Sequence, residues 1–229
     1  MKKLGLMVST VVLTAMLFVG INGCTVSEDA VVDPTFTFKT VTNPKTGRVW
    51  MDRNLGATRV ATSSTDVESY GDLYQWGRGA DGHEKRTSGT TSTRSIVDIP
   101  GNGNFIPTTA ANSDWRSPQN NNLWQGKNGI NNPCPSGFRL PTELEWNAER
   151  LSWSSNNSVG AFASPLKLPR AGSRYYGSGA LQKVGELGQY WSSTVDGIYS
   201  MNLVFTSSSG ASLDADFRSF GYSVRCIKD

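Results

Sequence analysis

Three cysteines and one histidine are the side chains with the widest chemical range in this chain, and their positions limit what it could catalyse. The only histidine, His83, lies in the polar run Ala80-Asp81-Gly82-His83-Glu84. Nucleophilic catalysis by serine or cysteine needs a positioned base, which is most often a histidine. We interpret this run as an exposed loop, so we expect His83 to have no catalytic role.

The first cysteine follows a segment that is typical of protein export. A basic N-terminal region precedes the mostly apolar, uncharged stretch 4–21, and this order defines a secretory signal. The run Ile21-Asn22-Gly23-Cys24 resembles a bacterial lipobox, whose cysteine is acylated and becomes the mature N-terminus. We therefore expect residues 1–23 to be a signal peptide and Cys24 to carry lipid, palmitate included. An uncleaved transmembrane anchor is the alternative, because the apolar stretch is nearly long enough to span a bilayer.

Residues 24–35 form a short polar stretch, which we interpret as the lipidated N-terminus and a flexible tether. Glu28 and Asp29 lie soon after the predicted lipid cysteine, as in the surface-export signal of Bacteroidota lipoproteins. We expect a lipid-anchored envelope protein in the outer membrane, exposed on the cell surface. Without Lys2 and Lys3 the chain keeps 20 of its 22 basic residues against 19 acidic ones. Such a balance predicts no nucleic-acid partner.

Cys134 and Cys226 remain as a pair once Cys24 is assigned to lipid. An even number of cysteines in an oxidising compartment indicates disulfide formation. We predict a disulfide between these two, which would close a loop of roughly 90 residues and contribute about 4 to 5 kcal/mol in the chain-entropy model. Two free buried thiols are the alternative. A zinc site is not expected, because two distant cysteines and one histidine do not supply its ligand set.

Two further groups of residues could bind an ion or a ligand. Asp214 and Asp216 are two residues apart, so on a strand they would share a face, and their oxygens suit calcium. Calcium is the one cofactor we consider, with a solvated strand face as the alternative. Trp115, Trp124 and Trp153 lie in polar, Asn-rich surroundings, where exposed indole rings could stack on sugar rings. Core filling, the commoner place of tryptophan, is the alternative for them.

The elements that would position these residues are mostly strands. Stretches 36–41 and 48–51 predict a hairpin around the Pro- and Gly-containing turn 43–47. Residues 70–76 could form a short helix or strand. Towards the C-terminus the candidate strands are 166–171, 174–176, 189–194, 198–206 and 222–227.

One helix has a clear predicted start. Thr142 and Glu145 have the spacing of a capping box, and the helix should end near Ser152. Three apolar residues repeat at helical spacing and predict one buried stripe: Leu144, Ala148 and Leu151. The order of strands, one helix and more strands predicts an α+β domain over residues 36–229, with mainly antiparallel pairing, few helices and many loops.

The segment 77–132 is dominated by Gly, Ser, Thr and Asn, and it lacks the periodicity of a helix or a strand. A segment of this length inside a domain is often functional. We hypothesise that it presents exposed aromatic residues to a ligand. The alternative is a pinned structural loop whose aromatic side chains fill the core.

Five sequence blocks, in this order, resemble a known family. They span residues 50–57, 70–78, 134–146, 188–194 and 223–226. The series resembles the Fibrobacter succinogenes major paralogous domain, which occurs in surface and secreted proteins of Fibrobacter and Bacteroidota. The part from Arg139 to Trp146 also resembles formylglycine-generating enzymes, which have a variant C-type-lectin fold. The resemblance implies a C-type-lectin-like architecture, and the paralogous family brings no established activity with it.

These observations leave three functional hypotheses. The first is a noncatalytic binding or adhesion module, whose ligand would be a glycan or another envelope protein. The second is a structural or accessory subunit of a surface assembly. The third, a divergent enzyme of the formylglycine-generating fold, would need active-site cysteines, whereas Cys134 and Cys226 match the structural pair of the paralogous family. We therefore expect no enzymatic activity.

Overall fold

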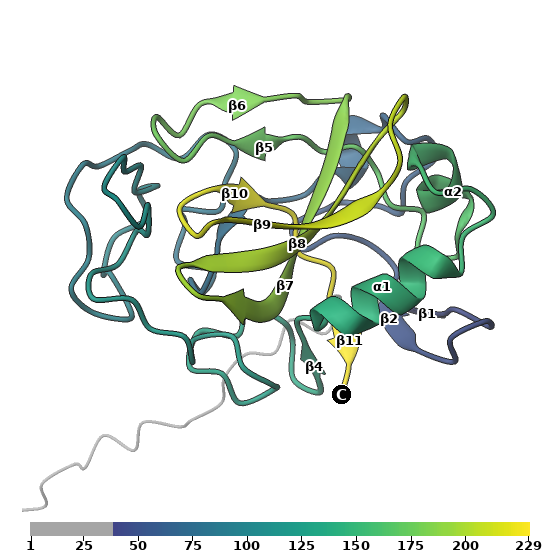
Figure 1. Cartoon of the computed structure of the whole chain (residues 1–229), viewed down its shortest axis with the longest axis horizontal. Helices are drawn as coiled ribbons and strands as arrows, with labels where there is room; N and C mark the ends of the chain where they lie inside the picture. The colour runs from purple at the N-terminus through teal and green to yellow at the C-terminus, as the bar shows by residue number, and fades with distance from the viewer. Residues whose placement is uncertain (1–38) are drawn as a thin grey trace, which may run out of the picture. The chain divides into compact units, whose positions relative to one another are not determined.

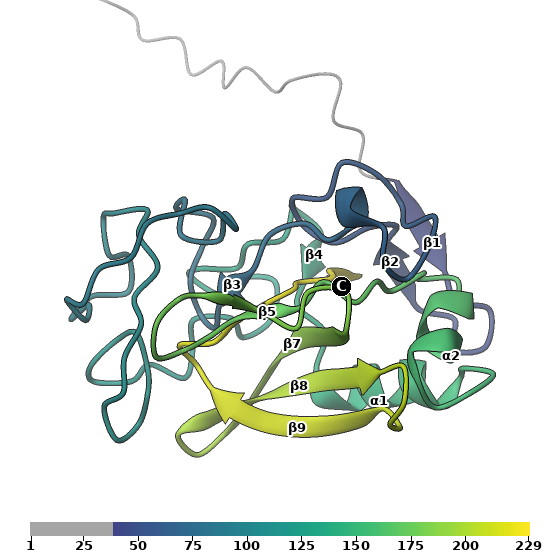
Figure 2. The same cartoon turned by 90° about the horizontal axis from the view of Figure 1, so that it is seen from above.

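A computed structural model describes residues 39–229 of the chain (Figures 1 and 2). The predicted signal peptide 1–23, the predicted lipid site Cys24 and the tether 24–35 lie outside the described residues. Among the residues that are described, no helix has the length and apolar character that crossing a membrane requires.

Antiparallel strands form three small open sheets, and the helices are few and short. The first sheet has the order β1-β2-β11-β4, with strands Thr40–Thr42, Val49–Met51, Ile227–Lys228 and Phe138–Arg139. The second has the order β3-β10-β5-β6, with strands Tyr74–Gln75, Gly221–Tyr222, Ser173–Arg174 and Leu181–Gln182. The third has the order β7-β8-β9, with strands Leu187–Asp196, Tyr199–Thr206 and Ser212–Phe217. The predicted mainly antiparallel pairing, with few helices, is confirmed.

The β1–β2 hairpin forms around the predicted turn. Val41 pairs with Trp50, and the Gly47 amide donates to the Asn43 carbonyl at 2.8 Å. Gly47 has φ of +68°, a left-handed conformation that costs glycine little. The Phe36 end of the predicted first strand lies outside the described residues.

Strands β7 and β8 form the longest pairing in the described chain, and the sheet is buried on both faces at its centre. Tyr190 packs in one apolar cluster with Leu203 and Phe205. Its neighbour Trp191 points to the opposite face and packs in a second cluster with Tyr222. The predicted strands 189–194 and 198–206 are confirmed. Because both faces of these strands are buried, their sequences do not alternate simply between polar and apolar residues.

One of the predicted strands is absent from the structure, and another is divided in two. Residues 166–171 form no strand, because Lys167 takes a φ of +46° and the Leu168 amide donates to the Ala161 carbonyl at 3.2 Å. The apolar side chains of that stretch are buried from a loop instead. The predicted strand 222–227 is divided into β10 and β11, and Cys226 lies just before β11.

The principal helix, α1 (Glu143–Leu151), begins where the capping box predicts. The Glu145 amide donates to Thr142 Oγ1 at 3.2 Å, and the Thr142 amide donates to Glu145 Oε2 at 2.9 Å. The short helix η1 (Val67–Ser69) and the six-residue helix α2 (Ser158–Ala163) were not predicted. Both are too short to show a helical period in the sequence.

The stripe predicted to be buried on α1 is wrong. Leu144 and Leu151 are 78% and 69% exposed, and Ala148 is also exposed. The helix instead buries Trp146 and Glu149. A large indole removes more apolar area from water than a leucine does, so the rotation of the helix follows its tryptophan.

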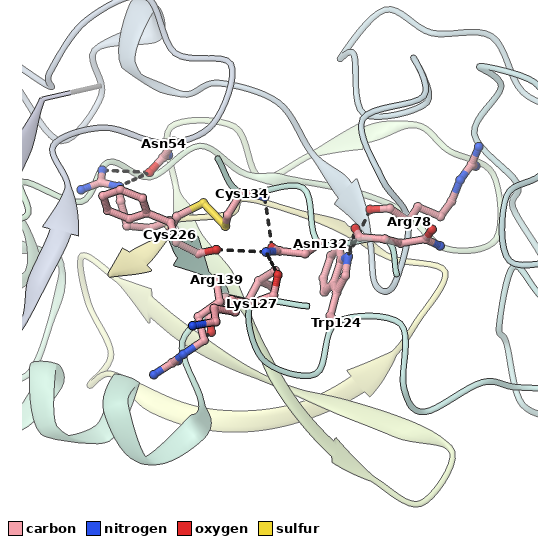
Figure 3. Close-up of a disulfide and its surroundings, with 12 residues drawn as sticks. Asn54, Arg78, Trp124, Lys127, Asn132, Cys134, Arg139 and Cys226 are labelled. Carbon is pink, nitrogen blue, oxygen red and sulfur yellow. Dashed lines mark hydrogen bonds between the residues drawn. A yellow bond between two sulfur atoms is a disulfide. The ribbon is translucent and has the colours of Figure 1, made fainter. Parts of the chain in front are cut away.

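The predicted disulfide is present. Cys134 and Cys226 are joined across 92 positions of sequence, with their Cα atoms 5.9 Å apart (Figure 3). Asn132 orders the backbone on one side of the bond, because its Oδ1 accepts from the Cys134 amide at 3.1 Å and its Nδ2 donates to the Phe138 carbonyl at 3.0 Å. The bond therefore ties the segment before α1 to the C-terminal strand.

The five sequence blocks meet one another in the core. The Trp191 indole donates to the Tyr74 carbonyl at 2.8 Å, and the Trp146 indole donates to the Trp191 carbonyl at 3.0 Å. Buried Arg225 donates to Asn54 Oδ1 at 2.9 Å. The blocks thus serve as the scaffold of the body.

Candidate functional site

Two of the three candidate tryptophans are part of the core. Trp115 and Trp124 have no exposed surface, so the expectation of exposed aromatic rings is wrong for both. The Trp115 indole donates to the Trp76 carbonyl at 2.7 Å, and the Trp124 indole donates to the Asn131 carbonyl at 2.9 Å. These contacts pin the segment 77–132 from within, which is the alternative that the sequence left open.

The third candidate, Trp153, is nearly buried but reaches the surface at one edge. It is 8% exposed, and its indole donates to Glu149 Oε1 at 3.1 Å. Its edge lines a hollow of about 150 Å³ beside Ser152 and Pro165. A ligand role for Trp153 stays a prediction.

His83 is buried, so its assignment to an exposed loop is wrong. Its Nδ1 lies 2.6 Å from Asp81 Oδ1, and its Nε2 accepts from the Gln75 amide at 3.0 Å. The ring is therefore neutral with its proton on Nδ1, and burial lowers its pKa to about 4. Both nitrogens are occupied by hydrogen bonds inside the fold.

Among residues 39–229, one group of three side chains has the spacing of metal ligands: Asp81, His83 and Glu84. The Nε2 lone pair that His83 would give to a metal already accepts a hydrogen bond from the Gln75 amide. Glu84 Oε2 accepts from the Gly82 amide at 2.8 Å, and Asp81 Oδ2 accepts from Arg78 at 2.6 Å. The group is thus a hydrogen-bonded brace for the loop.

Asp214 and Asp216 both lie on β9, as the calcium hypothesis requires. Asp214 is exposed, whereas burial raises the pKa of Asp216. Asp216 Oδ2 accepts from the Tyr222 hydroxyl at 3.0 Å and from Asn202 Nδ2 at 2.9 Å. Calcium takes six to eight oxygen ligands, so two carboxylates do not complete a site. Calcium binding here stays a prediction.

The sequence reasoning missed a surface built from five aromatic rings, which we name the aromatic cluster: Tyr175, Tyr176, Tyr199, Phe217 and Phe220. Ring centroids lie 4.6 Å apart for Tyr175 and Tyr176, and 5.2 Å apart for Tyr176 and Phe217. Phe220 is 4.8 Å from Tyr176, and Tyr199 is 5.1 Å from Phe217. Tyr175 is 38% exposed, and the other four rings are partly exposed.

Three separate turns bring these rings together. They follow β5, join β7 to β8, and join β9 to β10, and all three lie at the same end of the sheets, next to the loops of the segment 77–132, in both views (Figures 1 and 2). The segment 77–132 supports this end, because the Thr108 amide donates to the Tyr176 carbonyl at 2.8 Å. Gln119 Nε2 also donates to the Ile198 carbonyl at 3.0 Å.

The aromatic cluster is anchored to the core beneath it. Phe220 stacks on buried Tyr222 at 5.2 Å, and Tyr222 contacts Trp191 at 4.4 Å. The Tyr222 hydroxyl in turn holds Asp216, the residue before Phe217. The partly exposed rings are therefore fixed to the core through Tyr222, which also holds the carboxylate of Asp216. A pair of aromatic residues beside a glycine, as in Tyr175-Tyr176-Gly177, is the signal that could have identified it.

Comparisons with protein-family models, with curated proteins and with solved structures find no match to this chain. The resemblance to the paralogous domain therefore depends on the five sequence blocks alone.

Proposed function

We propose that this chain is a noncatalytic binding module of a cell-envelope lipoprotein, and that its ligand is a glycan held at the aromatic cluster. The observation that carries the proposal is the convergence of five partly exposed rings from three separate turns on one surface. Exposed apolar groups that gather in this way mark sites of interaction on soluble domains.

The chemistry of this surface suits a sugar. Tyrosine combines an apolar ring face with a polar hydroxyl, so it can contact both the C–H face and the hydroxyl groups of a pyranose. The polar groups close to Tyr175 and Tyr176 include Ser178 and Thr109, both of them exposed. The rings are held in place by the core, which lowers the entropy cost of binding.

Two observations support a noncatalytic role. Both nitrogens of His83 are occupied by hydrogen bonds within the fold. Cys134 and Cys226 form a disulfide, so neither offers the free thiol that formylglycine-generating chemistry would need. The remaining part of the proposal follows from the sequence: acylation at Cys24 and a place in the outer membrane, facing the surroundings of the cell.

We also propose that the body is a C-type-lectin-like variant of the paralogous-domain family. This is supported by the five sequence blocks, which pack against one another in the core, and by the disulfide between the segment before α1 and the C-terminal strand. An experimental structure whose strands superimpose on a C-type-lectin domain in the same order would support this assignment; a different strand order would refute it.

The glycan proposal is tested with the full chain in detergent against a panel of xylan, mixed-linkage β-glucan, galactomannan, starch and mucin glycans. We expect retention on at least one of them in affinity gels. Tyr175→Ala should weaken that binding about tenfold or more, because truncating an aromatic hot-spot residue costs about 2 kcal/mol or more and each 1.4 kcal/mol or so is tenfold in affinity. The effect of Tyr176→Ala should be similar.

Leu181→Ala is the matched control, since Leu181 is 45% exposed on β6 and is not one of the five rings. It should leave binding unchanged. Absence of binding to the whole panel would contradict the proposal. So would binding that survives both tyrosine substitutions while thermal unfolding shows the variants to be folded.

A further inference from the structure

The outward face of α1 carries apolar residues that the fold does not cover. Leu144, Ala148 and Leu151 are exposed, and they have the i, i+4, i+7 spacing of a helix face that packs against a partner. The opposite face is already used, because Trp146 and Glu149 are buried in the body. The helix thus has two apolar faces. Within residues 39–229, the face with Trp146 packs against the body, and the face with Leu144 and Leu151 has no packing partner.

A hollow of about 540 Å³ lies between this face and the β1–β2 turn. Its size is within the roughly 300–1,000 Å³ range of binding pockets. The small side chain of Ala148 leaves room between the two leucines, and the lining is completed by Lys45, Thr46, Arg48, Glu145 and Ser152.

The two walls of this hollow are tied together. Lys45 Nζ donates to the Ser152 carbonyl at 2.5 Å, at the C-terminal end of α1. Asn43 Nδ2 donates to Glu149 Oε2 at 2.6 Å and to Ser152 Oγ at 2.8 Å. A groove with fixed walls is organised before its ligand arrives, which reduces the cost of binding.

The charge at this groove is positive. Lys45 is exposed, and the Arg48 side chain is 54% exposed. The carboxylate of Glu145 is committed to Arg139, with both of its oxygens 2.8 Å from guanidinium nitrogens, and to the Thr142 amide. Arg48 Nη2 lies 3.8 Å from Glu145 Oε1, farther than the guanidinium nitrogens of Arg139. Two cations therefore border the leucines, against the single carboxylate of the lining, which Arg139 already binds.

We infer that this groove binds an acidic amphipathic segment of a partner protein. Aliphatic side chains of that segment pack on Leu144 and Leu151 across Ala148, and its carboxylates face Lys45 and Arg48. The surface lies on different elements from the aromatic cluster, so this inference does not depend on the glycan proposal.

The same charges disfavour a second copy of this chain as the occupant. In a two-fold pair whose helices run antiparallel, the same flank of each helix lies on the same side of the contact. Such a pairing through the outward face of α1 would bring Lys45 and Arg48 of both copies together. Like charges placed together weaken an interface.

The test uses two helical peptides of about 14 residues with the same leucine stripe, one flanked by glutamates and the other by lysines. Fluorescence anisotropy measures their binding to the full chain in detergent. We expect the glutamate peptide to bind about tenfold or more tightly than the lysine peptide, and Leu144→Asp to abolish the binding. Reversing both cations, with Lys45→Glu and Arg48→Glu, should reverse the preference between the peptides.

Val159→Asp is the matched control, because Val159 is 65% exposed on α2, away from the groove lining, and should have no effect. Equal binding of the two peptides, or binding that Leu144→Asp leaves intact, would overturn the inference. Sedimentation of the full chain as a dimer that Leu144→Asp dissociates would assign the groove to self-association and would also overturn it.

Discussion

Several polar residues inside this body are held in complementary hydrogen bonds that brace its loops. Arg78 is buried and donates to the carbonyls of Asn102 and Asn104 and to Asp81. Asp81 in turn holds His83. The sequence could not reveal this burial, because a polar run such as Ala80-Asp81-Gly82-His83-Glu84 looks the same whether water or the protein supplies its partners.

The burial of His83 predicts an acid-sensitive fold. The unfolded chain binds a proton at His83 below about pH 6.5, whereas the folded chain resists it until about pH 4. The free energy of unfolding should therefore fall as the pH falls through this window, by about 2 kcal/mol between pH 7 and pH 5. Urea unfolding at the two pH values measures the difference.

His83→Asn supplies the control for this prediction. The variant is expected to be less stable at pH 7, because it gives up buried hydrogen bonds. Since the chain has no other histidine, its stability should change little between pH 7 and pH 5. An equal pH dependence in wild type and variant would show that another group controls it.

Elements differ in how far the sequence determines them. The start of α1 was predicted, because the partners of its capping box, Thr142 and Glu145, are three residues apart and need no tertiary contact. The sequence alone does not predict which face of α1 is buried, because the rotation of the helix depends on how Trp146 and Trp153 pack in the core. The exposed leucines of the further inference are a direct consequence of this rotation.

Removing the cap should destabilise the body measurably. Thr142→Ala deletes the acceptor of the Glu145 amide and should lower the free energy of unfolding by about 1 kcal/mol, within the usual range of 0.5–2. Urea unfolding measures it, with the exposed Thr87→Ala as the matched threonine control. Equal stability of the two variants would mean that the Glu145 contacts with Arg139 hold the helix start without the hydroxyl.

At the scale of the whole molecule, the disulfide could be predicted by counting, whereas the aromatic cluster could not. Once Cys24 is set aside, two cysteines allow a single pairing. The aromatic cluster instead needs Tyr176, Tyr199 and Phe217 to meet from three turns, and their convergence is a property of the folded sheets. The composition of the segment 77–132 predicts a ligand-facing role, yet its own aromatic rings lie inside, and the segment contacts the cluster through the Tyr176 carbonyl.

The lipid anchor is a prediction about the whole chain. In bacterial cells supplied with labelled palmitate, we expect the wild-type protein to incorporate label and to sediment with membranes. Cys24→Ala should abolish labelling and release the protein from the membrane fraction, since acyl chains are what hold it there. Cys134→Ala combined with Cys226→Ala keeps the lipid site and serves as the labelling control. Label that persists in Cys24→Ala would place the acyl group elsewhere.

The bond between Cys134 and Cys226 also makes a covalent ring of the chain between them, and that ring contains α1 and the whole aromatic cluster. A protease that cuts one loop within the ring leaves two fragments still joined through sulfur. Neither α1 nor the aromatic cluster is then shed from the rest of the chain, because the fragments separate only under reducing conditions. A protein built in this way can be nicked between these cysteines and still keep its parts together.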